Sequence, residues 1–379
     1  MRVLLVGNYE SDGQESMQRF AAFMARGLRQ AGHEARIVRP RALLGVLHPS
    51  GKGFGKWLGY LDKFGSFPFV LKSEIEWADV VHICDHSNSF YTKYLRLVPH
   101  IVTCHDLLAV RSALGEIPQN PTRWTGRELQ RLILKGLTKA QHIACVSDAT
   151  RSDLLRIADI REQRVSRVYN SLNYPYSPME KYEAVRRLRK LCVDPSRLFL
   201  LHVGGNQWYK NRLGVLRIFS TLRNLTGSQT LTLVMVGKPW TAEMRQFILE
   251  NRMTDVTLEL TAVADEDLRA LYSTATMMLF PSLQEGFGWP IVEAQACGCP
   301  VATSRRCPMN EVAGDAAIYI DPENSDSSAV IVKQALDKVV SMRESSIANA
   351  ARFRSGMIDS YLSLYEKVRN EKPKKVPVN

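Results

Sequence analysis

The sequence predicts an α/β protein of two doubly wound domains, each a parallel sheet flanked by helices. Its 379 residues are too many for one ordinary core and suit two domains of roughly 150–200 residues each. Short apolar runs alternate with amphipathic helical patterns along both halves of the chain. Each half also opens with a buried strand that ends in glycine and leads through a loop into a helix. This strand-loop-helix order is typical of Rossmann-like domains.

The composition is that of a soluble globular protein. With 45% hydrophobic and 23% charged residues, the chain does not have a disordered composition. No stretch approaches the roughly 18 apolar residues of a membrane span, and residues 1–7 contain no signal-peptide core. The seven cysteines include no C-x-x-C pair, so most are expected to be buried thiols. We therefore expect a cytoplasmic protein.

The net charge of +12 indicates an anionic partner. Most of the positive excess lies in residues 1–170. Basic surfaces attract anionic lipids, nucleic acids or phosphorylated ligands. The sequence has no zinc finger, RNP string or helix-turn-helix signature, so we expect no nucleic acid partner. Peripheral contact with the inner face of a membrane is the favoured alternative.

The first domain opens with elements expected at 2–7 (strand), 16–30 (helix) and 34–39 (strand). The loop after the first strand lacks G-x-G-x-x-G, which disfavours a dehydrogenase. This loop holds Gly13 and Gln14, and the glycine permits close backbone approach to a ligand.

Residues 51–73 interleave aromatic side chains with lysines. Such a segment can lie in a membrane interface or against a lipid-linked acceptor. It can equally be a helix that covers the edge of the sheet and keeps its lysines in water. The sequence leaves both interpretations open.

Two more buried strands are expected at 77–84 and 100–104, and His105 follows the second. Ligands bind at the carboxyl ends of the strands in parallel sheets, although a lone histidine there is more often a structural hydrogen-bonding residue. Asp106 is expected to cap nearby backbone. His82, Asp85 and His86 form a similar strand end and are weaker candidates.

The first domain is expected to continue with a helix at 126–140, a strand at 143–147 and a helix capped by Asp148. Proline and charge in 174–196 are typical of an inter-domain connection. The second domain then opens with a strand that ends at Gly204 and Gly205.

Lys210 lies behind these glycines at the start of the next predicted helix. A fixed positive charge beside unpaired backbone N–H groups suits a diphosphate. The alternative is a solvated lysine in a βα loop.

Further strands are expected at 231–237 and 256–264, and Asp265-Glu266-Asp267 follows the second. These acids formally spell D-x-D, a metal-binding pattern. They open a helix, however, where carboxylates favour the positive end of the helix dipole. We therefore expect helix capping and no metal.

The most informative stretch is 276–304, which reads as a strand at 277–280, a glycine-punctuated loop, a helix and a second strand. Pro290 suits the first turn of the helix, and Gly298 suits its end. Glu285 on the loop and Glu293 in the helix can accept hydrogen bonds from the hydroxyls of a sugar. Solvated acids on a crossover loop are the alternative.

The string E-G-F-G-W-P-x-x-E at 285–293 resembles the E-x7-E signature of retaining GT-B glycosyltransferases of family 4, and T-C-H-D-L resembles the family's H-D-L element. The resemblance covers almost the whole chain. It implies the GT-B fold, with two Rossmann-like domains facing across a cleft. It also implies transfer of a hexose from a nucleotide-diphosphate sugar to an acceptor hydroxyl with retention of configuration, without cofactor or metal.

The resemblance also implies roles for the matching residues. Glu293 would hold the ribose hydroxyls, and Glu285 the donor sugar. The family commonly has a second cation near Lys210, but Tyr209 precedes that lysine here, so Arg212 is the candidate. The implied catalytic residues are His105, Glu285 and Lys210. Donor binding is assigned to Glu293, Phe287, Gly288, Gly286, Gly205, Arg212 and Val263, and the acceptor-side loop to Gly13 and Gln14.

The expected domains are 1–173 (acceptor side), 174–196 (linker), 197–344 (nucleotide sugar) and 345–379 (a helix crossing back to the first domain, plus a tail). The alternative function is a catalytically silent sugar- or lipid-binding module with the GT-B fold. A phosphorylase or epimerase would need a pyridoxal-phosphate lysine site or paired acids, and neither is evident. Donors of the GDP-mannose or UDP-glucose type both stay compatible, and the acceptor would be a saccharide or a lipid-linked molecule in polysaccharide, lipopolysaccharide or glycolipid synthesis.

Overall fold

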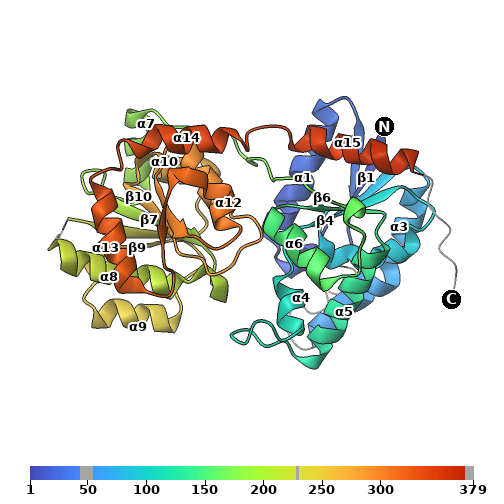
Figure 1. The fold of residues 1–379 in the computed structure, drawn as a ribbon, viewed down its shortest axis with the longest axis horizontal. Coiled ribbons are helices and arrows are strands. Elements are labelled where there is room, and N and C mark those ends of the chain that lie inside the picture. Colours follow the sequence, from blue (N-terminus) through green and yellow to red (C-terminus); the bar gives the residue numbers. More distant parts are fainter. Residues whose placement is uncertain (43–53, 228–229, 372–379) are drawn as a thin grey trace. The chain divides into compact units, whose positions relative to one another are not determined.

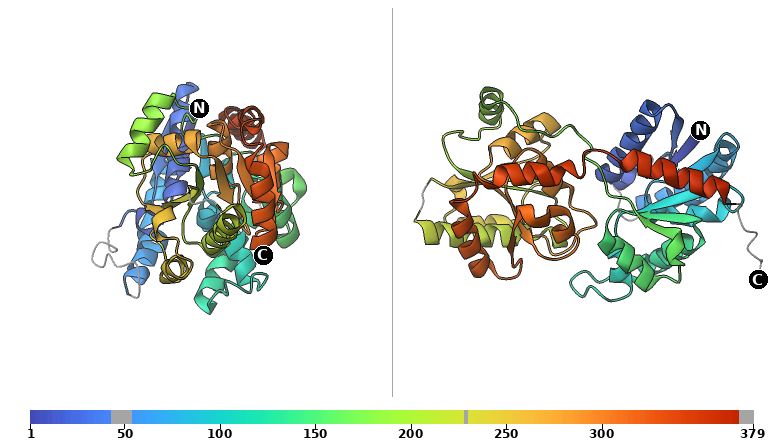
Figure 2. Two further views of the ribbon diagram at one scale, coloured as in Figure 1. Left: turned by 90° about the vertical axis from the view of Figure 1, so that its left-hand side faces the viewer. Right: turned by 45° about the horizontal axis from the view of Figure 1, so that its top comes forward.

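The computed structural model describes residues 1–42, 54–227 and 230–371. The chain divides into two compact units, Met1–Tyr169 with Gly356–Asn379 (unit 1) and Asn170–Ser355 (unit 2). Each unit contains a six-stranded parallel sheet with helices packed around it (Figure 1). The second set of views shows the same layering in each unit (Figure 2). These features confirm the predicted α/β fold of two doubly wound domains.

Unit 1 has the strand order β2-β1-β3-β4-β5-β6. The strands are β1 (Arg2–Val6), β2 (Glu34–Val38), β3 (Val80–Ile83), β4 (His100–Cys104), β5 (His142–Cys145) and β6 (Val165–Arg167). β3, β4 and β5 are buried along their whole length, as strands covered on both faces are. The strand order reverses direction between β1 and β3, which makes the carboxyl ends of these two strands the place for a ligand.

The helices of unit 1 are α1 (Glu15–Gln30), α2 (Phe54–Leu61), α3 (Phe67–Ile75), α4 (Leu108–Ala113), α5 (Trp124–Lys139), α6 (Asp148–Ile157) and α15 (Met357–Asn370). Other helical segments are η1 (Glu10–Asp12), η3 (Asp62–Ser66), η4 (His86–Tyr94) and η5 (Glu162–Arg164). Neither α4 nor η4 was predicted from the sequence. The cap of α6 was predicted wrongly: Ser147, not Asp148, is the N-cap, and its hydroxyl accepts from the Thr150 N–H.

The segment 51–73 falls partly outside the described residues. Its described side chains pack largely inward, because Phe67 and Leu71 belong to the core of unit 1 and Phe64 packs against that core. Lys63 pairs with Asp12 at 2.5 Å. Helix α3 and η3 therefore pack on the core of unit 1 as in the second sequence interpretation, but Lys63 is paired with Asp12 and does not lie free in water.

The last helix, α15, packs on unit 1 although it ends the chain. The hydroxyl of Tyr365 lies 2.8 Å from Nδ1 of His82, and the hydroxyl of Tyr361 lies 2.7 Å from Oγ1 of Thr103. Thr103 in turn lies 2.7 Å from Nε2 of His82. This buried chain of hydrogen bonds fastens α15 to β3 and β4.

Unit 2 has the strand order β12-β11-β10-β7-β8-β9. The strands are β7 (Phe199–Gly204), β8 (Thr232–Gly237), β9 (Thr257–Leu260), β10 (Met277–Phe280), β11 (Val301–Ser304) and β12 (Ala317–Ile320). Here the order reverses between β7 and β10. Gly237 shows how closely β7 and β8 approach at their carboxyl ends: a Cβ there would lie 2.0 Å from the Gly204 carbonyl oxygen.

The helices of unit 2 are α7 (Lys181–Lys190), α8 (Arg212–Thr226), α9 (Ala242–Glu250), α10 (Asp265–Thr274), α11 (Trp289–Ala296), α12 (Met309–Ala313), α13 (Ser325–Leu336) and α14 (Met342–Ala351), with η6 (Trp208–Lys210), η7 (Thr254–Val256) and η8 (Gly314–Ala316). No helix was predicted where α9 lies. The core of unit 2 is a cluster of side chains from β7, β8 and β10 with α8, α9 and α13.

Several element boundaries differ from the sequence predictions. The expected strand 256–264 ends at Leu260. The helix expected from about 345 to 368 is two helices, because the chain turns at Gly356 with φ +92°. The division between units lies at Tyr169 rather than 173, and 174–196 belongs to unit 2, where Arg187 of α7 pairs with Asp267 at 2.7 Å.

Candidate active site

A buried ion pair lies where the strand order of unit 2 reverses. Lys210 follows β7 in η6, and Glu285 follows β10; the lysine Nζ lies 2.7 Å from Oε1 and 2.9 Å from Oε2 of the carboxylate. Their side chains are only 14% and 7% exposed. The N–H of Leu283 donates to the Tyr209 carbonyl at 2.7 Å, so the two loops are also joined through the backbone. Lys210 is therefore not the solvated lysine of the alternative interpretation.

Glu293 sits within α11 and is 93% buried. The hydroxyl of Tyr272, from α10, donates to its Oε2 at 3.0 Å. Burial, and then the negative charge of Glu293, raises the pKa of Tyr272, so this phenol stays a hydrogen-bond donor. The carboxylate keeps further capacity to accept hydrogen bonds.

The loop that contains Gly286 and Gly288 leads directly into α11. Gly288 is the N-cap residue with φ +100°, a conformation that favours glycine, and Pro290 lies in the first turn as predicted. Gly286 and Phe287 precede the cap; Phe287 is buried and packs edge-to-face on Phe353, with ring centroids 5.6 Å apart. The first turn of α11 thus lies between Glu285 and Glu293 in the sequence.

Arg212 is the buried first residue of α8, directly after the loop that follows β7, and burial lowers its pKa. Its Nη1 donates to the carbonyl of Lys238 at 2.7 Å and also bonds Oδ1 of Asn206. The side chain therefore ties the loop after β7, which contains Gly205, to the loop after β8. Nη1 of Arg212 therefore fastens the two loops, while its Nε and Nη2 are buried with no hydrogen-bond partner among the described residues.

Val263 lies in the loop after β9, half-buried, next to Ala262 with φ +53°. The acids that follow it occupy the first turn of α10. Asp267 is buried and pairs with Arg187, so it fastens α7 rather than facing an ion. In the described part of the chain, no group of three or more His, Cys, Asp or Glu side chains is placed to hold a metal.

Unit 1 has a polar cluster at its own reversal point. Asn8 follows β1 and Asp85 follows β3, and Nδ2 of Asn8 donates to Oδ2 of Asp85 at 2.5 Å. The same amide bonds Oε1 of Gln14, beside Gly13, whose φ of +64° shapes the loop. Nδ1 of His86 lies 3.1 Å from Oδ1 of Asp85. Burial lowers the pKa of His86, but the Asp85 carboxylate, with Asp106, outweighs it, so the pKa is raised. Asn8 was not predicted, although its place after the first strand is the available signal.

His105 is 94% buried at the end of β4. Its Nε2 donates to the Cys84 carbonyl at 2.9 Å, and its ring meets Phe20 edge-on with centroids 4.7 Å apart. Burial lowers the pKa of His105. The imidazole is thus neutral and held in a fixed orientation.

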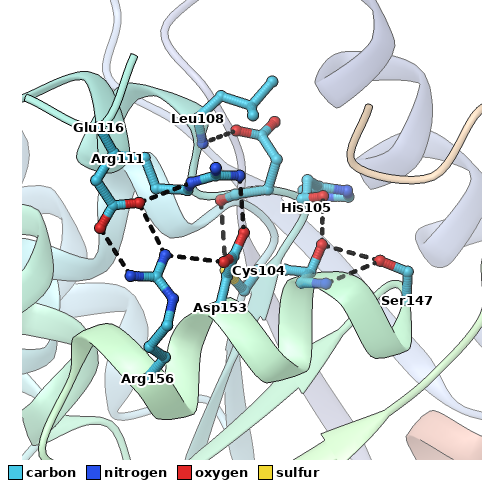
Figure 3. Close-up of polar contacts among 10 residues, drawn as sticks. Cys104, His105, Leu108, Arg111, Glu116, Ser147, Asp153 and Arg156 are labelled. Atoms are coloured by element: carbon cyan, nitrogen blue, oxygen red, sulfur yellow. Dashed lines mark hydrogen bonds and ion pairs between the residues drawn. The ribbon is translucent and has the colours of Figure 1, made fainter. Parts of the chain in front are cut away.

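The loop that carries His105 is fastened on both sides (Figure 3). Asp106 accepts from the Leu108 N–H at 3.0 Å and so orients the backbone at the start of α4, whose N-cap residue is Leu107. Thr150 of α6 donates to the His105 carbonyl at 3.4 Å. Beyond this loop, Arg111 of α4 and Glu116 after it form a four-residue network with Asp153 and Arg156 of α6, joined by ion pairs of 2.7 to 3.2 Å.

The predicted donor-side residues Lys210, Glu285 and Glu293 therefore gather around the loops of unit 2. Gly13, Gln14 and His105 lie at the carboxyl ends of strands in unit 1. Two models of known families match these same two parts of the chain: Glycosyltransferase Family 4 matches residues 17–174 and Glycosyl transferases group 1 matches residues 188–353. The chain belongs to the family 4 glycosyltransferases of the GT-B fold.

Two proteins that are similar to this chain are mannosyltransferases, in agreement with its assignment to a glycosyltransferase family. The O-antigen chain mannosyltransferase B of Escherichia coli is 27% identical over 66% of this chain and 64% of its own length. The O-antigen chain mannosyltransferase RfbU of Salmonella typhimurium is 26% identical over 54% of this chain and 53% of its own length. The matches thus span less than two thirds of either relative.

The fold of this family 4 chain also matches solved structures. Anabaena Alr3699/HepE in complex with UDP and glucose superposes with a TM-score of 0.72 at 15% identity, covering 98% of both chains. At this identity the likeness shows the fold. Among the described residues, none of the helices has the length and apolar character needed to cross a membrane.

Proposed function

We propose that the protein is a retaining glycosyltransferase, which moves a hexose from a nucleoside-diphosphate sugar to an acceptor hydroxyl in polysaccharide or lipopolysaccharide synthesis. The observation that carries the proposal is the joining of Lys210 to Glu285 at the reversal point of the unit 2 sheet, beside the loop that leads to Glu293. Ligands of doubly wound sheets bind at this point.

In this proposal Glu293 accepts hydrogen bonds from the ribose hydroxyls and Glu285 from the hydroxyls of the donor sugar. The backbone N–H groups near Gly286, Phe287 and Gly288 supply donors at the start of α11. The backbone near Val263 would meet the nucleobase.

The leaving diphosphate develops negative charge as the glycosidic bond breaks, and preorganised positive groups lower the barrier. In this proposal Lys210 supplies the positive charge, and the backbone N–H groups that follow Gly205 supply hydrogen-bond donors. Because Nη1 of Arg212 already bonds both loops, we propose that Arg212 positions them; its Nε and Nη2 have no hydrogen-bond partner among the described residues. No resident metal or cofactor is proposed, since the acids of the D-x-D pattern serve α10 and α7.

Retention of configuration would follow from attack on the same face that the diphosphate leaves, with the departing phosphate accepting the acceptor's proton. His105 would contact the donor sugar as a neutral hydrogen-bonding group. Gly13 and Gln14 would lie on the acceptor side. The arrangement of the two domains across a cleft stays a prediction.

The donor is proposed to be GDP-mannose, because two relatives are mannosyltransferases of O-antigen chains. UDP-glucose is the second candidate, because a structure of the same fold holds UDP and glucose. Incubating the protein with each donor and a saccharide or lipid-linked acceptor, followed by NMR of the product's anomeric linkage, tests both donor and stereochemistry. Transfer with inversion would contradict the proposed mechanism.

The alternative is a silent sugar- or lipid-binding module. It predicts acceptor binding without nucleotide binding or transfer, and it predicts no loss of function in Glu293→Gln. Screening nucleoside diphosphates by thermal shift separates the two, because a ligand that binds the native state raises Tm.

A further inference from the structure

On α3, η4 with the turn after it, and α5, unit 1 carries exposed cationic side chains that form no ion pair with a carboxylate in the part of the chain that the structure describes: Lys72, Lys93, Arg96, Lys135 and Lys139. We call these five residues the basic surface. They come from α3, from η4 and the turn after it, and from α5, and η4 packs against both helices (Figure 1). Two of the nearby acids are engaged with other cations: Glu128 pairs with Arg131 at 2.5 Å, and Glu74 lies 3.7 Å from Arg36. Glu76, at the end of α3, is exposed.

The basic surface is continuous. Lys93 and Lys72 approach the ring of Tyr94 from two elements, with Nζ 4.7 Å and 5.7 Å from its centroid. Lys135 and Lys139 are one turn apart on α5 and share a face. Desolvation, and then repulsion from Lys135, Arg96 and Lys93, lowers the pKa of Lys139, so these charges lie close together.

Exposed apolar side chains stand beside these charges. Phe69 is 75% exposed and one turn before Lys72, Leu97 is 74% exposed and follows Arg96, and Leu132 is 38% exposed and one turn before Lys135. Such apolar groups gain nothing from contact with a purely ionic partner. Basic side chains interleaved with exposed apolar ones are typical of surfaces that lie in a lipid interface.

We propose that the basic surface docks unit 1 on an anionic phospholipid membrane, with its cations at the headgroups and Phe69 and Leu97 at the acyl boundary. This site differs from the one indicated by the sequence at 51–73, whose described aromatic side chains largely pack inward; only Phe69 and Lys72 belong to both. The inference goes beyond the proposed transfer chemistry and does not require it.

The test uses the full chain and vesicles of phosphatidylcholine with or without phosphatidylglycerol. Each Lys or Arg near an anionic surface contributes about a fivefold factor in binding. We therefore expect K93Q/K135Q/K139Q to weaken co-sedimentation with the anionic vesicles about 100-fold. F69S/L97S should retain the salt dependence but reduce binding at high salt, where only apolar insertion persists.

The matched control is K181Q/R189Q/K338Q, which removes three exposed positive charges from unit 2 and should leave vesicle binding within about twofold, since these side chains lie outside the basic surface. Equal losses in both triple variants would overturn the proposal, as would binding to duplex DNA in preference to the vesicles. Transfer to a water-soluble acceptor should be unchanged in K93Q/K135Q/K139Q, so failure of the membrane proposal and of the transferase proposal are separate results.

Discussion

Lys210 and Glu285 form a buried ion pair although 75 residues separate them in the chain. They meet because β7 and β10 are neighbours in the sheet and each residue follows one of these strands. Removing one partner of a buried pair leaves an uncompensated charge. We therefore expect Lys210→Met to reduce the free energy of unfolding by about 3 kcal/mol, the lower end for fully buried pairs, as measured by urea denaturation.

The double variant K210M/E285L should recover part of this loss, because it removes both charges. A double-mutant cycle should give a coupling of about 1–3 kcal/mol between the two sites. Additive losses would show that the pair contributes nothing as a pair. K210M, E285L and the double variant should all lose transfer activity, since both side chains are assigned to the donor.

Tyr272 orients Glu293, so Tyr272→Phe should raise KM for the donor several-fold with little change in kcat. It should also lower stability by about 1 kcal/mol through the lost hydrogen bond. Tyr319→Phe is the matched control, because its hydroxyl donates to the Gly314 carbonyl at 2.6 Å in the same unit. The assignment of Glu293 to the donor is wrong if both variants raise KM equally.

Arg212→Lys distinguishes a residue that fastens loops from one that binds phosphate. Lysine keeps the charge but cannot reproduce the planar guanidinium contacts to two loops. We expect KM for the donor to rise about tenfold in both R212K and R212A, because each loses one positioning contact of about 1.4 kcal/mol, which corresponds to a factor of ten. Near-normal KM in R212K, with a large loss in R212A, would instead indicate a direct electrostatic role at the diphosphate.

Stability should fall as the pH drops below 6.5. Burial lowers the pKa of His82 and His202 to about 3 and that of His142 to about 4. A depressed folded pKa gives stability that is present above the unfolded pKa and is lost as pH falls toward the folded one. Between its folded and unfolded pKa, each such histidine lowers the free energy of unfolding by up to about 1.4 kcal/mol for each pH unit that the pH falls.

His86 opposes this trend, because its raised pKa favours the folded state below pH 6.5. Urea denaturation at pH 7, 6 and 5 should show a falling free energy of unfolding for the native chain and a steeper fall for His86→Gln. A free energy that stays constant or rises over this range would contradict the buried, neutral state of the histidines.

The sequence predicted the elements whose local signals agree with the fold. Met277–Phe280 reads as a strand because it is apolar throughout, and Pro290 and Gly298 mark the limits of α11. Signals that depend on tertiary contacts were missed. The N-cap choice between Ser147 and Asp148 needs the backbone angle, since both residue types cap well.

The candidate site shows the same limit. Glu285, Glu293 and Lys210 were identified by their motif, but the contact of Lys210 with Glu285 depends on the strand order. The fastening role of Arg212 depends on the Lys238 carbonyl, which no sequence pattern marks. Asn8 and Tyr272 have no motif of their own and became visible only through their contacts with Asp85 and Glu293.

The central claim is that unit 2 holds a nucleoside-diphosphate sugar through Glu293. Isothermal titration of GDP-mannose and UDP-glucose into the native chain and Glu293→Gln tests it most directly, with the exposed Glu344→Gln on α14 as control. We predict that one donor binds the native chain and the control equally, and that Glu293→Gln weakens binding at least tenfold, since a hydrogen bond to a charged group contributes about 1.5–3 kcal/mol. Binding of neither donor, or equal binding by Glu293→Gln, would contradict the account.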